Sequence, residues 1–188
     1  MVPFRRTTKE AEGVLGVLAA NGLKQGENIL QVWVMCEIAA NVLAIDDFAK
    51  LFDGVSIVSN DLTPLVLGVD RDSSELANVF DEENVAVKTA ISQAIEGAHR
   101  NSRMVGLCGQ APIDKPEFAA FLVEKGIDSI SLTPDSVMKA IAIIAEAEEK
   151  FSVVADQYNL MALEKEISNA IQETTEVTSH KKTGAAAA

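Results

Sequence analysis

Four short apolar runs recur along the chain, and each is followed by a segment with helical periodicity. The runs predict strands at 29–37, 55–58, 104–107 and 127–132, and the helices are expected at 46–52, 81–100, 114–125 and from 133 onward. Nearly continuous apolar runs are typical of strands buried on both faces of a parallel sheet. Strands that alternate with helices at this spacing predict an α/β fold with parallel strands and crossover helices.

One connection and one helix of this pattern have distinctive sequences. The connection between the second strand and its helix is expected over 62–73, because it contains Pro64 and Gly68. The long helix at 81–100 carries a broad apolar face. The residues of this face are Val85, Ala86, Ile91, Ala94, Ile95 and Ala98.

The chain begins with a remnant of the same pattern. Residues 1–4 are apolar and are expected to end a strand, and Thr7 with Glu10 forms a capping box for the helix that follows. Gly22 is expected to stop that helix in a left-handed conformation. Four strand–helix units are half of a TIM (β/α)8 barrel, so residues 1–150 are predicted to be a partial barrel domain.

The pattern changes after this domain. Residues 151–178 are expected to form a helical extension with a narrow apolar stripe, which consists of Leu160, Leu163, Ile167 and Ile171. The stripe would pack either on its own domain or on another copy of the chain. Residues 179–188 are of low complexity and are expected to be a disordered tail.

Composition and charge restrict the partners. The net charge of −12 argues against nucleic acid and against anionic membranes. No apolar run reaches the roughly 20 residues of a membrane span, and no secretory signal follows the N-terminus. Cys36 and Cys108 lie far apart without a C-x-x-C motif, so reduced thiols in a cytoplasmic protein are expected.

Polar residues stand where three consecutive predicted strands end: Glu37, then Asn60 with Asp61, then Cys108. In a parallel barrel these ends share one rim. Two carboxylates suit Mg²⁺, which leaves its other positions to water and substrate oxygens. A thiol beside a metal-bound substrate can exchange a proton, and Arg71 could hold a carboxylate or phosphate. Taken singly, the same residues also fit structural roles: a turn, a small core side chain and an ion-pair partner.

At these positions the chain resembles the C-terminal barrel of the phosphoenolpyruvate synthase (pyruvate, water dikinase) family. Pyruvate, phosphate dikinase and enzyme I of the sugar phosphotransferase system are related to it. The resemblance covers roughly residues 1–150 and implies that they are the C-terminal half of the TIM (β/α)8 barrel. It rests on six segments, in order. They are Pro3-Phe4 with Arg6-Thr7, 34–38 with Asn41-Val42, Asp53-Gly54 with 59–63, 67–73, 106–112, and 126–131 with Pro134-Asp135-Ser136.

The resemblance implies a role for each candidate. Glu37 and Asp61 match the family's Mg²⁺ ligands, and Asn60 matches a substrate-binding amide. Arg71 matches an arginine that holds the transferring phosphoryl group, and Cys108 matches the cysteine that exchanges the proton at the pyruvate methyl carbon. The implied reaction is phosphoryl transfer from a phosphohistidine on another domain to the enolate oxygen of pyruvate. In the complete enzyme, ATP, pyruvate and water become AMP, phosphoenolpyruvate (PEP) and phosphate.

The chain also departs from the family's pattern. Val58 stands where the family usually has glycine, Pro64 where it has glutamine, and Ile113 where it has serine. Ala39-Ala40 replaces a Pro-Ser pair after Glu37. A valine adds bulk where the backbone approaches substrate, and a proline removes a hydrogen-bond donor.

Two functions are compatible with these features. The chain could be a fragment or subunit of PEP synthase that acts with the missing N-terminal portion, which would carry the nucleotide-binding and phosphohistidine domains. Alternatively, it could be a catalytically inactive half-barrel that self-associates or serves as a binding module. An open half-barrel exposes strand edges and apolar surface, so a partner is expected in either case, including a second half-barrel in a homo-oligomer.

Overall fold

The computed structural model describes residues 1–70, 79–109 and 111–152. The chain divides into two compact units, Met1–Ala147 and Glu148–Ala188, and the sheet and candidate site belong to the first. Arg71 and the apolar stripe over 160–171 lie outside the described residues. No helix in the described ranges is long and apolar enough to cross a membrane.

Four parallel strands form one sheet, in the order in which they occur in the chain. They are β1 (Trp33–Cys36), β2 (Gly54–Val58), β3 (Met104–Cys108) and β4 (Ser129–Ser131). Because each strand pairs with the next one along the chain, the sheet has the topology of one arc of a β/α barrel. The α/β class and the parallel sheet are confirmed.

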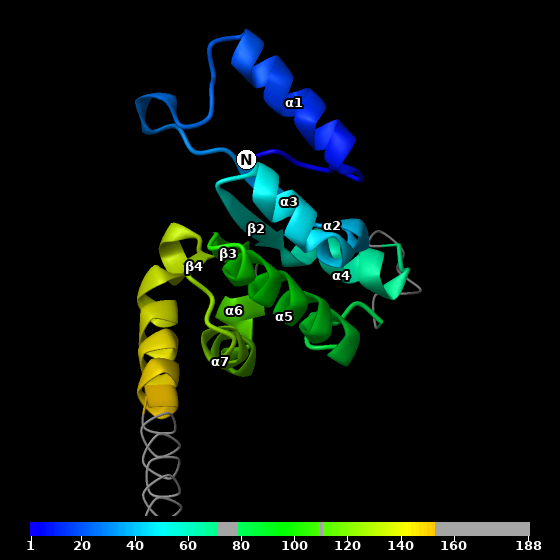
Figure 1. Cartoon of the computed structure of the whole chain (residues 1–188). Coiled ribbons are helices and arrows are strands. Elements are labelled where there is room, and N and C mark those ends of the chain that lie inside the picture. The colour runs from blue at the N-terminus through cyan, green and yellow to red at the C-terminus, as the bar shows by residue number, and fades with distance from the viewer. Residues whose placement is uncertain (71–78, 110, 153–188) are drawn as a thin grey trace, which may run out of the picture. The chain divides into compact units, whose positions relative to one another are not determined.

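Helices connect these strands. They are α1 (Thr8–Ala20), α2 (Ala39–Leu43), α3 (Ile45–Leu51), α4 (Ser59–Leu67), α5 (Val85–Arg100), α6 (Ala111–Asp114) and α7 (Pro116–Glu124). Two 3₁₀ segments, η1 (Glu27–Ile29) and η2 (Pro134–Ser136), and helical residues 137–152 complete the described chain. Figure 1 shows α3, α4 and α5 side by side on one face of the sheet, and α5 contacts β2 and β3.

The two faces of the sheet differ in burial. Side chains that point to the helices are at most 1% exposed, namely Val34, Cys36, Val55, Ile57, Val105 and Leu107. Side chains alternate between faces along a strand, so the other face carries Trp33, Met35 and Met104. The first two are half-buried and Met104 is 54% exposed. The prediction of a buried strand is therefore correct for β2, whose five residues are all buried. The prediction of burial on both faces is wrong for β1, in which buried and half-buried residues alternate.

The N-terminal segment behaves as predicted. Val2 forms a parallel bridge with Val34: its N–H donates to the Trp33 carbonyl (2.7 Å), and its carbonyl accepts from Met35 (2.9 Å). The hydroxyl of Thr7 caps α1 by accepting from the Glu10 N–H at 3.2 Å. The chain thus begins with the end of a strand and the capped helix α1, and both precede the first complete strand–helix unit.

The first strand is shorter than predicted. Ile29 is 98% exposed and has a φ of 59°, because the turn at Gly26 continues into η1. The strand begins only at Trp33. An apolar run therefore includes residues that never enter the sheet.

Two helix boundaries also differ, each for a local reason. The side chain of Asn84 caps α5 by accepting from the Ala86 N–H (2.9 Å), so Val85 is 78% exposed and lies off the predicted apolar face. The helix predicted over 114–125 is split, because Pro116 forces Lys115 into an extended conformation (φ −126°, ψ 97°).

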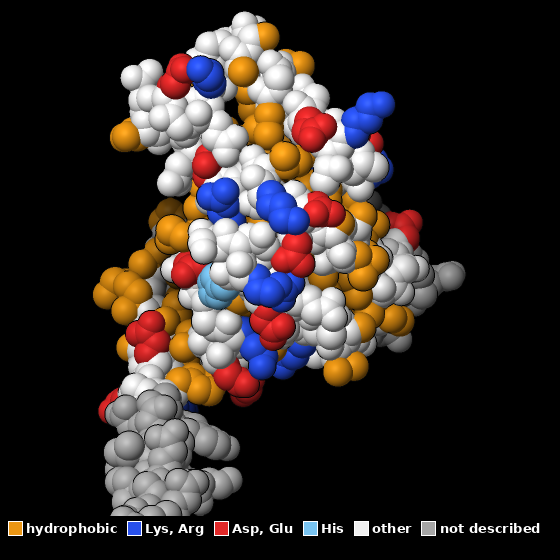
Figure 2. All heavy atoms as spheres, viewed as in Figure 1, with side chains coloured by type: hydrophobic (Ala, Val, Ile, Leu, Met, Phe, Trp, Pro, Cys, Tyr) orange, Lys and Arg blue, Asp and Glu red, His pale blue; other side chains and the backbone are white. Residues whose placement is uncertain are grey.

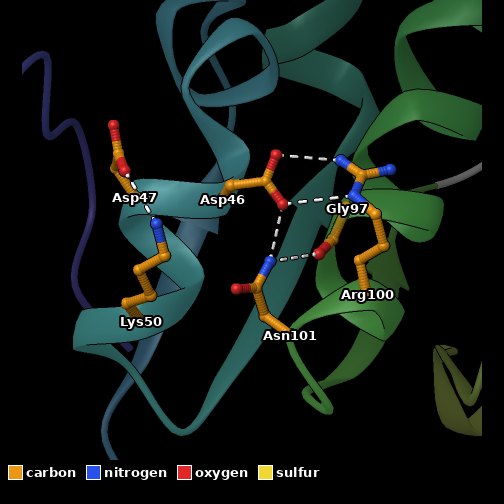
Figure 3. A network of polar contacts seen from close by, with 6 residues as sticks. All are labelled: Asp46, Asp47, Lys50, Gly97, Arg100 and Asn101. Carbon is orange, nitrogen blue, oxygen red and sulfur yellow. Dashed lines mark hydrogen bonds and ion pairs between the residues drawn. The ribbon is translucent and has the colours of Figure 1, made fainter.

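The helix layer is fixed by polar contacts as well as by its core. Asp46, in the first turn of α3, accepts from Arg100 (2.9 Å) and from Asn101 (2.7 Å) at the C-terminal end of α5 (Figure 3). A Cβ at Gly97 would lie 2.2 Å from Cγ2 of Ile45, so glycine permits this close helix packing. Figure 2 shows acidic and basic side chains intermixed across this face.

Candidate functional site

The candidate residues lie at the carboxyl ends of neighbouring parallel strands. Glu37 follows β1, Asn60 and Asp61 follow β2, and Cys108 ends β3. In addition to burial, the charge of Asp61 raises the pKa of Glu37, and the charges of Asp61 and Glu37 raise the pKa of the Cys108 thiol. The structure thus brings Glu37, Asp61 and Cys108 together on one rim, as a shared strand polarity requires.

Glu37 is a buried carboxylate, 2% exposed. Burial raises its pKa, the hydrogen bond donated by the Phe4 N–H lowers it, and the neighbouring Asp61 raises it further. Arg5 has a weaker lowering effect. The carboxylate therefore carries a desolvation penalty when ionised, which a cation beside it would offset.

Asn41 holds the backbone around Glu37. It is fully buried, its amide donates to the Arg5 carbonyl (2.7 Å), and its carbonyl oxygen accepts from the Ile38 N–H (3.3 Å). Phe4, whose N–H donates to Glu37, immediately precedes Arg5. It has a φ of 42°, an uncommon conformation for a residue with a side chain. The N-terminal segment is therefore part of the structure that positions Glu37.

Asn60 and Asp61 lie in the first turn of α4, so the connection predicted over 62–73 is wrong in its first half. Pro64 lies inside this helix, where it removes only the bond that its N–H would have made to residue 60. Gly68 ends the helix with a φ of 67°.

Val58 does not distort the backbone in front of this turn. Its φ of −112° and ψ of 92° are ordinary extended values that any residue adopts. The side chain is 7% exposed and lines the pocket beside Asn60. Compared with a glycine, the valine side chain therefore takes up space in the pocket without requiring a special backbone conformation.

Cys108 is the accessible thiol of the chain. Burial raises its pKa, a hydrogen bond with the Ser56 hydroxyl lowers it, and the carboxylates of Asp61 and Glu37 raise it. Cys36 is fully buried, and burial raises its pKa to about 12. Ser56 is not among the site residues predicted from the sequence, although the alternation of side chains along β2 places it on the same face as Val58.

An open pocket of about 330 Å³ joins the ends of β2, β3 and β4. Asn60 and Cys108 both line it, and the end of β4 contributes polar groups that the sequence analysis did not single out. The full lining is Val58, Asn60, Cys108, Gly109, Ser131, Leu132 and Thr133. The volume lies at the lower end of the range that is usual for small-molecule sites.

The metal-binding capacity of the rim is limited to its carboxylates. Within the described ranges, no group of three or more His, Cys, Asp and Glu side chains is arranged to hold a metal. Two carboxylates fit Mg²⁺, which takes one or two and completes its shell with water and substrate oxygens. The burial of Glu37 beside a like charge is consistent with a cation at this position.

Sequence comparison shows relatives that are much longer. Residues 1–149 match the family model described as PEP-utilising enzyme, PEP-binding domain. A phosphoenolpyruvate synthase from Synechocystis is 57% identical over 149 residues, which are 79% of this chain and 18% of that protein. One from Escherichia coli is 49% identical over 149 residues, which are 79% of this chain and 19% of that protein. The chain thus spans less than a fifth of these curated relatives.

Solved structures support the fold. A citrate lyase from Burkholderia xenovorans matches with a TM-score of 0.57 and 15% identity, over 84% of this chain and 53% of that one. A pyruvate kinase from Cryptosporidium parvum matches with a TM-score of 0.52 and 14% identity, over 77% of this chain and 29% of that one. Both are TIM-barrel-like, so the four-stranded sheet is half of such a barrel. The chain belongs to the PEP-utilising enzymes, and its residues 1–149 are part of their PEP-binding domain.

Proposed function

We propose that this chain carries the Mg²⁺ and pyruvate site of a phosphoenolpyruvate synthase and acts with the N-terminal portion that its relatives contain. The observation that supports this is one rim with a carboxylate pair and a half-buried thiol, Glu37, Asp61 and Cys108. The high identity to phosphoenolpyruvate synthases across the same residues supports it as well. The cytoplasm would be the site of action.

Each residue has a defined task in this proposal. Glu37 and Asp61 hold Mg²⁺, which when bound stabilises the negative charge on the enolate oxygen of pyruvate. Asn60 orients the substrate in the pocket that it shares with Cys108. Arg71, which lies outside the described residues, holds the phosphoryl group.

Cys108 exchanges the proton at the methyl carbon. Burial and two nearby carboxylates raise its pKa and keep it in the thiol form. A thiol can give a proton to the methylene carbon of the enolate, and the resulting thiolate takes one back in the reverse direction. The Ser56 hydroxyl stabilises the thiolate when it forms.

The rest of the reaction needs a partner. Nucleotide binding and the phosphohistidine would come from the N-terminal portion, on the same or a separate polypeptide. That portion would also cover the open face of the sheet, where Met104 is 54% exposed.

Oxalate binding tests the proposal, because oxalate mimics enolpyruvate. The full chain is combined with the N-terminal portion of a synthase relative, and oxalate is titrated by calorimetry with and without Mg²⁺. We expect Mg²⁺-dependent heat that Asp61→Ala abolishes. Asp47→Ala, an exposed acid on α3 paired with Lys50, is the control and should bind normally. Absence of heat, or unchanged heat in Asp61→Ala, would contradict the metal assignment.

An inactive, self-associating half-barrel is the second candidate, favoured by Val58 in the pocket. Val58→Gly in the combined protein distinguishes the two. If PEP formation requires this substitution, the natural chain is a remnant that cannot admit substrate. If the unsubstituted chain already forms PEP, the remnant hypothesis is wrong.

A further inference from the structure

Glu82 is a buried carboxylate that the proposed reaction does not use. It precedes α5, is 7% exposed, and its Oε1 has no hydrogen-bond partner among the described residues. The hydroxyl of Ser59, fully buried at the start of α4, also lacks a partner there. A buried polar atom without a partner is destabilising, so two such atoms near one turn call for an explanation.

Both atoms lie beside Gly109, the residue that follows Cys108. A Cβ on Gly109 would be 1.9 Å from the Ser59 Oγ and 3.6 Å from the Glu82 Oε1. Since both distances are measured from one point, the hydroxyl and the carboxylate oxygen are near neighbours. One water molecule suits such a pair, because it accepts from a hydroxyl and donates to a carboxylate.

The orientation of Glu82 is fixed by its sequence neighbours. Asp81 and Glu83 both pair with Lys115, at 2.8 Å and 3.5 Å, and Glu83 also approaches Lys88 at 3.7 Å. These pairs attach the segment to α7 and leave Glu82 turned inward. The carboxylate is therefore held in place by contacts that do not involve the site.

We propose that Glu82 is a positioning residue, joined through one ordered water to the Ser59 hydroxyl. This link fixes the Ser59 side chain against Gly109, and so fixes the first turn of α4 relative to the Cys108–Gly109 turn. Ser59 immediately precedes Asn60, so this link sets the spacing between the thiol and the residues at the end of β2. Small displacements of catalytic groups have large effects on rate, so loss of this link should slow the proposed reaction. The catalytic part of this inference rests on the proposed function, whereas the structural link does not.

Alkylation of Cys108 by iodoacetamide tests the link on the full chain alone, without substrate or metal. Cys36 is fully buried and serves as the internal unreactive thiol. Glu82→Ala should speed alkylation of Cys108 about fivefold at every pH, which corresponds to the loss of roughly one hydrogen bond. Glu82→Gln keeps an oxygen acceptor and should react like the wild type. Glu83→Ala, whose partner Lys115 retains Asp81, should also be unchanged.

Ser59→Ala supplies a second test that removes no charge. It should reproduce the acceleration, and it decides the matter if circular dichroism shows that Glu82→Ala fails to fold. Unchanged alkylation in both alanine variants would overturn the inference. So would Glu82→Gln behaving like Glu82→Ala, or a shift in the pH midpoint of alkylation, because either would mean that the charge acts and the hydrogen bond does not. The alkylation test uses no substrate. It can therefore be interpreted even if oxalate does not bind and the proposed function is wrong.

Discussion

Gly109 occupies the point where the end of β3 meets the first turn of α4. A side chain there would collide with the Ser59 hydroxyl at 1.9 Å, whereas the Ser59 Cβ lies at 3.3 Å, a tight contact that a small shift would relieve. The thiol and the residues after β2 are thus in contact through one glycine and one serine. With Ser59 in this rotamer, only a glycine permits the approach.

Gly109→Ala should therefore destabilise the chain by about 1–3 kcal/mol, the usual range for overpacking a buried site. Ser59→Ala in the same chain removes the colliding atom and should recover most of the loss. Urea denaturation of the two single variants and the double variant measures this coupling. Additive effects of the two substitutions would mean that the residues do not touch.

Glu37 gives a pH-dependent prediction. Its pKa is raised above 4.5 in the folded chain, mainly by burial, so the folded state holds the proton more tightly than the unfolded state. The stabilisation of the folded state that results from this tighter proton binding is fully present below pH 4.5. It is lost as the pH rises through the pKa of Glu37 in the folded chain. The wild type should lose stability relative to Glu37→Gln across this interval.

Thermal unfolding of both proteins from pH 4 to pH 8 measures the difference. Adding Mg²⁺ at neutral pH should raise the midpoint of the wild type and leave Glu37→Gln nearly unchanged, because only a bound ligand stabilises the folded state. A difference that stays constant with pH would show that Glu37 ionises as freely in the folded chain as in the unfolded one.

At the scale of elements, two neighbouring acids on α3 have different tasks. Asp46 accepts hydrogen bonds from Arg100 at the end of α5 and from its C-cap Asn101, whereas Asp47 pairs with Lys50 within its own helix (Figure 3). Both lie in the first turn of α3, so their interactions with the helix dipole are similar. Comparing a substitution of Asp46 with the same substitution of Asp47 therefore measures how much the contact between α3 and α5 contributes to stability.

Asp46→Ala should lower the midpoint of urea denaturation measurably more than Asp47→Ala. Hydrogen bonds from Arg100, and then from Asn101, lower the pKa of Asp46 below its usual 3.8. Its contribution is therefore present above pH 3.8 and is lost as the pH falls through the folded pKa, so the two variants should converge in acid. Equal effects at neutral pH would mean that the link between α3 and α5 does not contribute to stability.

Elements were predicted better than their boundaries. Strands 55–58 and 104–107 match β2 and β3 closely, because β-branched or aliphatic runs between turn residues have few alternatives. Helix α4 was missed because Pro64 and Gly68 indicate a loop locally, yet burial of Leu62 and Thr63 holds the segment in a helix. Tertiary packing overrode local propensity there.

At the scale of the whole molecule, the rim could be predicted because parallel strands place their carboxyl ends together. Glu37, Asp61 and Cys108 required only strand order to be grouped. Glu82 could not be found in this way, since it follows no strand and reaches the rim only through the pairing of its neighbours with Lys115. Contacts between distant segments are absent from local patterns.

The open face of the sheet should cause the isolated chain to self-associate. Trp33 and Met35 are half-buried there and Met104 is 54% exposed, so a second copy could cover the face. Met104→Lys should weaken association in sedimentation velocity at micromolar concentration, because a charge would be buried at the contact. Leu43→Lys, at an 83% exposed position on α2, places the same charge on the helical side and should leave association intact. Trp33, the single tryptophan, reports the same event by fluorescence: its emission should shift to the blue with concentration in the wild type and not in Met104→Lys. A compact monomer throughout, or disruption only by Leu43→Lys, would show that this face is not the contact.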